Sequence, residues 1–243
     1  MKMTTHGNNL IQLTYYGFVN VYLVREDDGF TLIDTALEGC AKSIVQAARQ
    51  AGAPIVRILP THAHTDHIGG LDAVHKLVPE AEVLMPARDA RFLAGDMSLD
   101  ADEPQDKLRG GWVVRKVRPS RLLHEGDRVG SLEVIDTPGH TPGHAAFLDT
   151  RDRTILAGDA YQTMGAVAVS GTMTIFPLPA FATWHKPTAL VSGRKLRTFE
   201  PTRLAVGHGR VLEQPLAAMD RAIAHAARAL EQQEKNPITS GKA

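Results

Sequence analysis

The 243 residues contain a single cysteine, Cys40. An internal disulfide and a zinc site built on several thiolates are therefore excluded, so any bound metal must use nitrogen and oxygen ligands. Lys plus Arg and Asp plus Glu both number 27. This balance provides no long-range field that would gather nucleic acid or anionic lipid on the surface, and we expect no nucleic-acid partner.

Long hydrophobic runs are also missing. The segment from residue 1 to 11 contains Asn, Thr and His where a secretory signal needs a continuous apolar stretch, and no later run approaches membrane-spanning length. We therefore expect a cytoplasmic protein without a membrane partner. The apolar fraction of 43% is that of an ordinary globular protein. The length fits one large domain or two small ones, and we expect one domain over residues 1–243.

Apolar periodicity predicts two strand-rich halves, each followed by helices. Residues 10–34 alternate apolar and polar side chains around a turn, residues 41–51 are helix formers that stop at Gly52, and residues 55–59 form a short apolar strand. These patterns indicate an α/β fold with two packed sheets and helices outside. Two segments, 87–118 and 160–185, are expected to be insertions near the active site. Further strands are predicted at 81–85, 121–124, 132–136, 144–148 and 154–157, and helices at 69–78 and 216–234.

A histidine-rich motif follows the predicted strand 55–59 directly. Two imidazoles two residues apart, then a carboxylate and a third imidazole, can turn toward one point only in a loop that leaves a strand. The alternative is a histidine-rich surface loop without metal. The metal site is favoured, because three later predicted strands also end in loops that carry a histidine or an aspartate. The motif consists of His62, His64, Asp66 and His67, and the later residues are His140, Asp159 and His208.

This order of motifs, which begins with Asp34, resembles that of the metallo-β-lactamase superfamily. The resemblance implies a four-layer αββα sandwich, in which two mixed sheets hold two metal ions at one edge. Asp34 is then expected to orient a ligand histidine. The resemblance implies two sites that share one carboxylate: His62, His64 and His140 for the first metal, Asp66, His67 and His208 for the second, and Asp159 as the bridge.

His144 also follows a Pro-Gly turn, so it competes with His140 for the third position of the first site. In the superfamily the third histidine comes directly after the strand turn. We therefore favour His140 as the ligand, and we expect His144 to be packed or hydrogen-bonded nearby.

The resemblance and the ligand types predict a dinuclear hydrolase. Two divalent ions, most simply Zn²⁺ with Fe or Mn as alternatives, would supply a metal-activated hydroxide that cleaves an ester, lactone or thioester of a small molecule. True β-lactamases of the superfamily have Cys or Ser where this chain has Asp159, so β-lactam cleavage is not expected as the main activity. Other interpretations remain open: a mononuclear iron persulfide dioxygenase-like oxidoreductase, a glyoxalase II-like thioesterase, or a non-catalytic binding module.

Two side chains are predicted to act in catalysis. Asp66 is expected to accept a proton as the tetrahedral intermediate collapses, and Tyr161 to hydrogen-bond the developing oxyanion. The apolar segment 161–184 is expected to form a pocket wall for an apolar portion of the substrate. Alternatively, its large side chains belong to the core or to an oligomer contact, such as that of a homodimer. These side chains are Met164, Phe176, Phe181 and Trp184.

Overall fold

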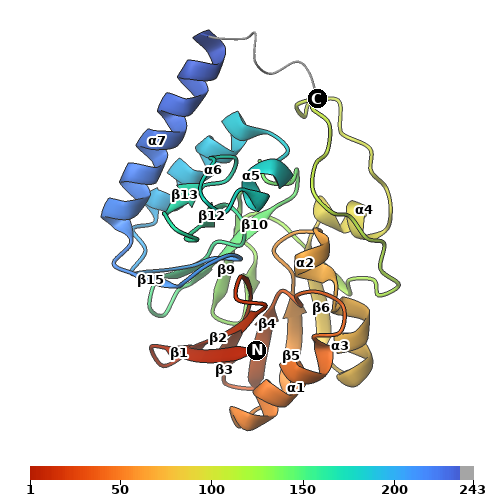
Figure 1. Cartoon of the computed structure of the whole chain (residues 1–243). Helices are drawn as coiled ribbons and strands as arrows, with labels where there is room; N and C mark the ends of the chain where they lie inside the picture. The colour runs from red at the N-terminus through yellow and green to blue at the C-terminus, as the bar shows by residue number, and fades with distance from the viewer. Residues whose placement is uncertain (236–243) are drawn as a thin grey trace.

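Two mixed β-sheets stacked face to face lie at the centre of the molecule, in a computed structural model that describes residues 1–235 (Figure 1). The N-terminal half of the chain builds the first sheet. Its first four strands pair antiparallel, and the next three add parallel strands. In spatial order the strands are β1 (Lys2–His6), β2 (Leu10–Tyr15), β3 (Val19–Glu26), β4 (Gly29–Ile33), β5 (Ile55–Leu59), β6 (Glu82–Pro86) and β7 (Arg121–Leu123).

The second sheet comes from the C-terminal half. Strands β8 to β11 pair antiparallel, β14 joins β11 in parallel, and β15 closes the edge antiparallel. A separate hairpin, β12 (Tyr161–Gln162) with β13 (Ala168–Val169), leaves this sheet after β11. In spatial order the strands are β15 (Leu212–Glu213), β14 (Arg203–Ala205), β11 (Thr154–Leu156), β10 (Ala145–Asp149), β9 (Leu132–Asp136) and β8 (Arg128–Val129).

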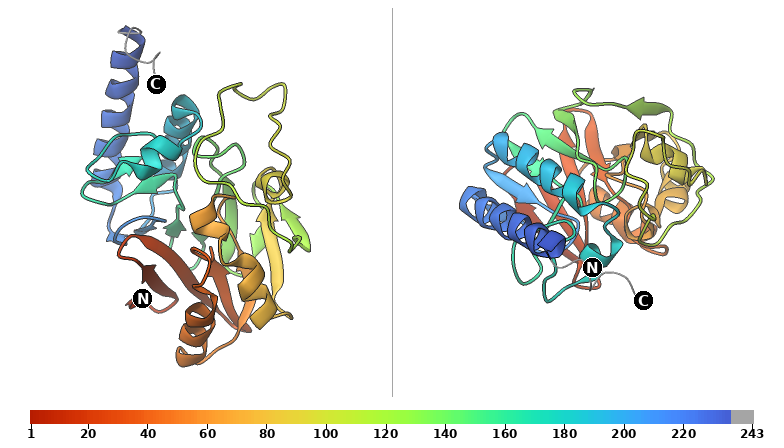
Figure 2. Two further views of the ribbon diagram at one scale, coloured as in Figure 1. Left: turned by 45° about the vertical axis from the view of Figure 1, so that its right-hand side comes forward. Right: turned by 90° about the horizontal axis from the view of Figure 1, so that it is seen from above.

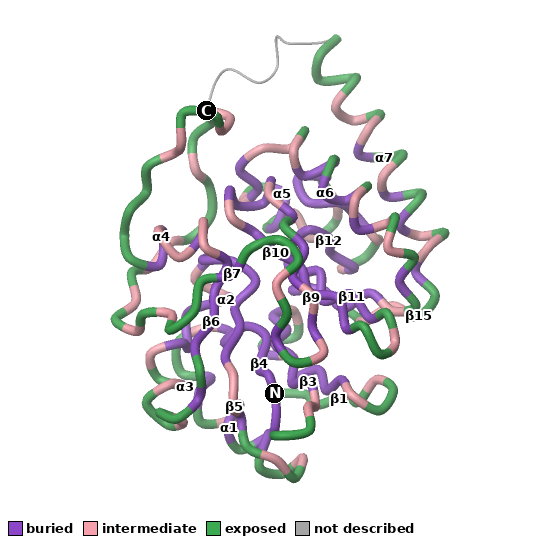
Figure 3. The backbone as a smooth tube through the Cα atoms, turned by 180° about the vertical axis from the view of Figure 1, so that it is seen from behind, coloured by how far each residue is buried: buried purple, intermediate pink, exposed green. Residues whose placement is uncertain are grey.

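Helices cover the outer face of each sheet, and the predicted four-layer αββα sandwich is confirmed. One apolar core lies between the sheets and contains Leu59 and Phe147. A second lies between the first sheet and its helices, and a third between the second sheet and its helices. The buried strands run through the middle of the molecule in Figure 3. The helices are α1 (Ala41–Gln50), α2 (Thr65–Ile68), α3 (Leu71–Leu77), α4 (Asp89–Leu93), α5 (Leu178–Ala182), α6 (Lys186–Thr198) and α7 (Leu216–Lys235).

The two predicted insertions lie side by side. The first is irregular after α4, and its residues 94–120 rise next to α5 (Figure 2). The indole Nε1 of Trp184 donates a hydrogen bond of 3.0 Å to the carbonyl of Asp106, which ties the two segments together. Both segments also reach the ligand loops, because the Arg109 carbonyl contacts His64 and the Thr183 hydroxyl contacts His140.

Strand β1 is not predicted from the sequence, because its residues are polar and largely exposed and show no apolar alternation. Within residues 1–235, no helix combines the length and the hydropathy needed to span a bilayer.

Candidate metal centre

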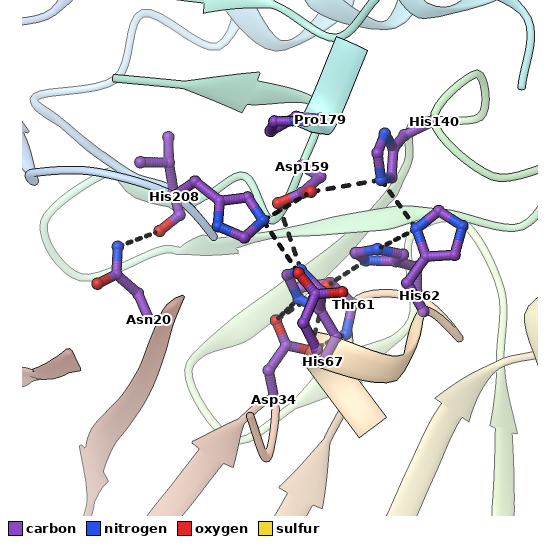
Figure 4. A network of polar contacts seen from close by, with 12 residues as sticks. Asn20, Asp34, Thr61, His62, His67, His140, Asp159, Pro179 and His208 are labelled. Atoms are coloured by element: carbon purple, nitrogen blue, oxygen red, sulfur yellow. Dashed lines mark hydrogen bonds and ion pairs between the residues drawn. The ribbon is translucent and has the colours of Figure 1, made fainter. Parts of the chain in front are cut away.

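Loops from both sheets bring all the predicted ligand side chains to one place. The two imidazoles that follow β5 lie beside Asp66 and His67 of α2. His140 comes from the turn between β9 and β10, Asp159 follows β11, and His208 follows β14. In Figure 4 the side chains of His140, Asp159 and His208 point toward the imidazoles of the first sheet. The separated loops of the sequence therefore form one cluster.

The first group consists of three buried imidazoles. His62 Nε2 lies 3.2 Å from His64 Nδ1, which lies 3.0 Å from His140 Nε2. Burial lowers the pKa of His64 to about 4, and burial together with the neighbouring imidazoles lowers the pKa of His62 and of His140 well below the usual range. These rings are neutral at pH 7, so their lone pairs are available to a cation.

The second group contains carboxylates. Asp66 Oδ2 lies 3.2 Å from His208 Nε2 and 3.8 Å from His67 Nε2. Burial opposes protonation of both rings. The carboxylates of Asp159 and Asp66 outweigh burial for His208 and raise its pKa to about 10. The same carboxylates, together with Asp34, also raise the pKa of His67. The second group therefore holds its charges as ion pairs.

Asp159 faces both groups. Its Oδ2 lies 3.3 Å from His140 Nε2 and 3.2 Å from His208 Nε2, while its Oδ1 lies 3.4 Å from His67 Nε2. Burial disfavours the charged carboxylate, but the imidazoles of His208 and His67, whose own pKa values are raised, hold the pKa of Asp159 well below the usual range. Asp159 is therefore placed so that it could be shared by two cations.

A second hydrogen bond orients each ligand imidazole. Backbone carbonyls and the Asp34 carboxylate can only accept, so three of the rings carry a proton on the outer nitrogen and direct the inner nitrogen at the centre. The predicted role of Asp34 matches this contact. The pairs are His62 Nδ1 with Thr61 Oγ1 (2.9 Å), His64 Nε2 with the Arg109 carbonyl (2.9 Å), His67 Nδ1 with Asp34 Oδ2 (2.7 Å), His140 Nδ1 with Ser170 Oγ (2.9 Å) and His208 Nδ1 with the Phe18 carbonyl (2.8 Å).

Two atoms at the middle of the cluster have no hydrogen-bond partner among the described residues. They are His67 Nε2 and Asp159 Oδ1, which are buried and lie 3.4 Å apart without forming a hydrogen bond. A buried polar atom without a partner is costly, and a bound cation would coordinate both atoms. The set of imidazole nitrogens and carboxylate oxygens also suits divalent transition metals. The residues present therefore fit a dinuclear metal site.

His144 lies next to the cluster but is fully engaged elsewhere. Its Nε2 accepts a 3.0 Å hydrogen bond from the backbone N–H of Asp159, and its Nδ1 lies 2.8 Å from Thr137 Oγ1. Neither nitrogen is free for a metal, which agrees with the choice of His140 as the ligand. His144 instead fixes the backbone that carries Asp159.

Tyr161 does not face the centre. Its side chain is fully buried in the core of the second half, and its hydroxyl donates a 2.8 Å hydrogen bond to the carbonyl of Gly193 in α6. The hydroxyl is absent from the lining of the cavity above the ligands. The prediction that Tyr161 bonds an oxyanion is therefore wrong. The short strand β12, which begins at Tyr161, directs this side chain toward α6.

A cavity of about 320 Å³ opens above the ligands and has one apolar wall. Part of the predicted wall is correct, since Phe181 lines the cavity. Met164 and Trp184 are absent from the lining, and Phe176 packs 5.6 Å from the ring of His208. The apolar lining consists of Phe18, Leu178, Pro179, Phe181 and Ala182, and Gly110 and Gly111 of the first insertion also line the cavity.

The first sheet holds the loop of His208 through residues that sequence reasoning missed. Asn20 Nδ2 donates to the carbonyls of Val206 (2.9 Å) and Gly209 (2.7 Å), and the Tyr22 hydroxyl donates to Val206 (2.7 Å). Both side chains lie on β3. The sequence signal for such a role is weak: Asn20 stands between two valines at the start of β3, where a polar side chain that becomes buried needs hydrogen-bond partners.

Comparison with known proteins identifies the family. The sequence profile of the metallo-beta-lactamase superfamily matches residues 14–208, a span that includes every converging side chain. The chain belongs to this superfamily. Together with the His and Asp clusters, this membership makes the protein a metal-dependent hydrolase.

Relatives and solved structures agree with this assignment. The chain is 48% identical to the uncharacterized Bacillus subtilis protein YobT over 92% of its own length and 97% of that protein. It is 30% identical to YflN of the same organism, named a probable metallo-hydrolase, over 78% of this chain and 80% of the relative. The DIM-1 metallo-beta-lactamase superposes with a TM-score of 0.70 over 94% of this chain and 97% of that one, at 14% identity, which is a likeness of fold.

Proposed function

We propose that this metallo-hydrolase cleaves the thioester, or the chemically similar ester, of a small molecule that carries an apolar acyl group. The convergence of the seven ligands beneath an apolar-walled cavity is the observation on which the proposal depends. Zn²⁺ suits imidazole and carboxylate ligands, and we propose it for both sites. A bound divalent pair supplies Lewis acidity and lowers the pKa of water toward neutrality.

The residues of the chain have distinct roles in this reaction. Asp159 and the imidazoles would hold the cations, and the orienting hydrogen bonds keep these ligand side chains in place. Asp66 is the most exposed ligand, with 34% of its side chain accessible, and it borders the cavity. Burial opposes its ionisation, but His67 and His208 hold the pKa of Asp66 well below the usual range, so it stays ionised. An ionised carboxylate at the edge of the cavity can accept a proton and pass it to the leaving group, but its lowered pKa makes Asp66 a weak base for this step.

The apolar wall selects the acyl group. Leu178 and Phe181 line the cavity, yet 56% and 59% of their surfaces are exposed, so a substrate can cover them. Covering such surface gains about 25 cal/mol per Å². Because Tyr161 is turned away, no tyrosine hydroxyl from this position is available to a lactone carbonyl. Lactones are therefore a weaker expectation than open-chain thioesters and esters.

Two relatives support thioesters. The chain is 33% identical to the hydroxyacylglutathione hydrolase of Rhodospirillum rubrum over 60% of its length, and 31% identical to the Gallus gallus acyl-coenzyme A thioesterase MBLAC2 over 58%. The matched regions cover 48% and 56% of these two relatives. The support therefore concerns about half of each of these relatives.

Metal analysis and a substrate panel test the proposal together. We expect two zinc ions per chain and hydrolysis of acyl thioesters, with KM falling as the acyl chain lengthens. His62→Ala and Asp159→Ala should abolish turnover while the sheets stay folded by circular dichroism. His225→Ala is the matched control, because this exposed histidine of α7 lies outside the cluster, and it should keep full activity. One iron per chain with persulfide oxidation, or full activity in either ligand variant, would refute the proposal.

A further inference from the structure

Asp89 is a buried carboxylate outside the ligand set. It is the first residue of α4 and has no exposed surface. The neighbouring Arg88 pairs with Glu103 at 2.7 Å, and among residues 1–235 Asp89 takes part in no ion pair. A buried charge without a counter-ion needs strong hydrogen bonds to persist.

Three donors supply those hydrogen bonds, and all belong to the loops of the first metal site. Asp89 Oδ2 accepts from the backbone N–H of Ala63 (2.8 Å) and from Thr141 Oγ1 (2.9 Å). Asp89 Oδ1 accepts from the backbone N–H of Gly143 (2.8 Å). Burial raises the pKa of Asp89 to about 6 and these donors oppose the rise, so the group is ionised at neutral pH.

Two of the three donors to Asp89 lie directly beside ligands of the first metal site. Ala63 lies between His62 and His64, and Thr141 follows His140. The two loops leave strands of different sheets, so their separation is not set by pairing within one sheet. The approach at the second loop is also close, because a Cβ at Gly143 would meet Asp89 Oδ1 at 2.7 Å.

We propose that Asp89 is a positioning residue for the first metal site, holding loop 61–64 and loop 137–144 at the separation at which His62, His64 and His140 converge. The inference rests on the proposed metal site but not on the identity of the substrate. Asp89 makes no hydrogen bond to the residues that hold Asp66, His67 or His208 in place. Its loss should therefore affect the first metal site much more than the second, which it reaches only through His144 and the shared Asp159.

Asp89→Asn is the informative substitution. The variant keeps the size of the side chain, but its amide group must face at least one of the three donors, so a hydrogen bond becomes a contact between two donors. Zinc affinity is measured by competition with a chelator in two backgrounds. His208→Ala removes a second-site ligand and reports on the first site, and His64→Ala removes a first-site ligand and reports on the second.

We expect Asp89→Asn to weaken zinc binding about 10- to 100-fold in the His208→Ala background and by less than about threefold in the His64→Ala background. Thr141→Val, which removes a single hydrogen bond, should weaken the same site less and serves if Asp89→Asn does not fold. Asp149→Asn is the matched control: this buried aspartate accepts from Arg151 at 2.9 Å, outside the metal loops. It should change neither affinity.

Two results would overturn the inference: equal weakening in both backgrounds, as expected from general destabilisation, or unchanged affinity in a folded Asp89→Asn protein. Zinc binding that follows the expected pattern in a protein without hydrolytic activity would instead reject the proposed function and leave the role of Asp89 standing. Absence of zinc affinity in both backgrounds would reject both.

Discussion

The two metal-binding groups differ in the charge they carry before a cation arrives. The first consists of three imidazoles with lowered pKa values, so it is neutral and has free lone pairs at pH 7. The second pairs imidazoles of raised pKa with the carboxylates of Asp66 and Asp159. The first group is therefore prepared for a metal, whereas the second must release protons to bind one.

The two groups also differ in what holds them. The first depends on the contact between two loops from different sheets, which Asp89 bridges. The second depends on β3, where Asn20 and Tyr22 fix the loop of His208. Separate supports mean that the two sites can be weakened one at a time, and the comparison can be tested by substitution.

Asp34 is the exception, and its loss should have the largest effect. Its carboxylate accepts from His67 Nδ1 at 2.7 Å, and also from the backbone N–H and hydroxyl of Thr61, whose Oγ1 contacts His62. We expect Asp34→Asn to weaken both sites and to lower kcat/KM by about 100-fold or more. Metal content after dialysis, measured with kcat/KM, checks this. Loss of one metal only would show that the supports are more separate than the contacts indicate.

The second-largest expected effect is a difference between the two sites in how their metal affinity changes with pH. Without a cation, His208 has a pKa of about 10 and that of His67 is also raised, so both rings are protonated at pH 7. Raising the pH removes these competing protons, and affinity at the second site should rise by up to about tenfold per pH unit for each proton released. The first site, whose His64 has a pKa of about 4, should change little above pH 6.5.

Cobalt(II) titrations at pH 6.5, 7.5 and 8.5 measure both affinities by absorption. The His208→Ala variant gives the affinity of the first site, and the His64→Ala variant, which keeps both protonated rings, gives that of the second. Equal slopes with pH for the two sites would contradict the charge difference.

Asn20→Ala should have a smaller and selective effect. It removes the hydrogen bonds from Nδ2 to the carbonyls of Val206 and Gly209 without touching a ligand. We expect about tenfold weaker binding at the second site and unchanged binding at the first. Gln12→Ala is a suitable comparison, because Gln12 also donates to the Gly209 carbonyl, at 3.1 Å, but not to Val206. Weaker metal binding at the first site alone would contradict the claim that Asn20 stabilises the second site.

Tyr161→Phe should have the smallest effect. The variant loses one buried hydrogen bond to the Gly193 carbonyl, which is worth about 1 kcal/mol of unfolding free energy. Activity should be unchanged, because the hydroxyl is absent from the cavity lining. Denaturant unfolding and kcat/KM measure the two quantities. A large fall in kcat with normal stability would restore the catalytic role first predicted for this residue.

The sequence was sufficient to predict the elements that depend on local patterns. Helix 41–51 and strand 55–59 are found as α1 and β5, because apolar periodicity reports directly on the buried face. The ligand loops were also predictable, since a Pro-Gly turn or an adjacent glycine marks the end of a strand. Asp34 was identified as an orienting residue by resemblance, and the structure shows its contact with His67.

The remaining features depend on contacts between distant parts of the chain. Asn20 and Val206 are 186 residues apart in sequence, and no local pattern says which strand will reach that loop. The direction of Tyr161 depends on a two-residue hairpin strand, which is too short to give a periodic signal. An acidic residue at a helix start, such as Asp89, is common in any protein. Its contacts with the two ligand loops depend on the tertiary fold and have no local sequence signal.

A crystal structure of the zinc-loaded protein, with anomalous data collected at the zinc edge, would test the central claim most directly. We predict two peaks about 3.5 to 4 Å apart, one within bonding distance of His62, His64 and His140, the other of Asp66, His67 and His208, with Asp159 between them. No zinc peak at this cluster, or a single peak at a site that lacks these imidazoles, would contradict the account.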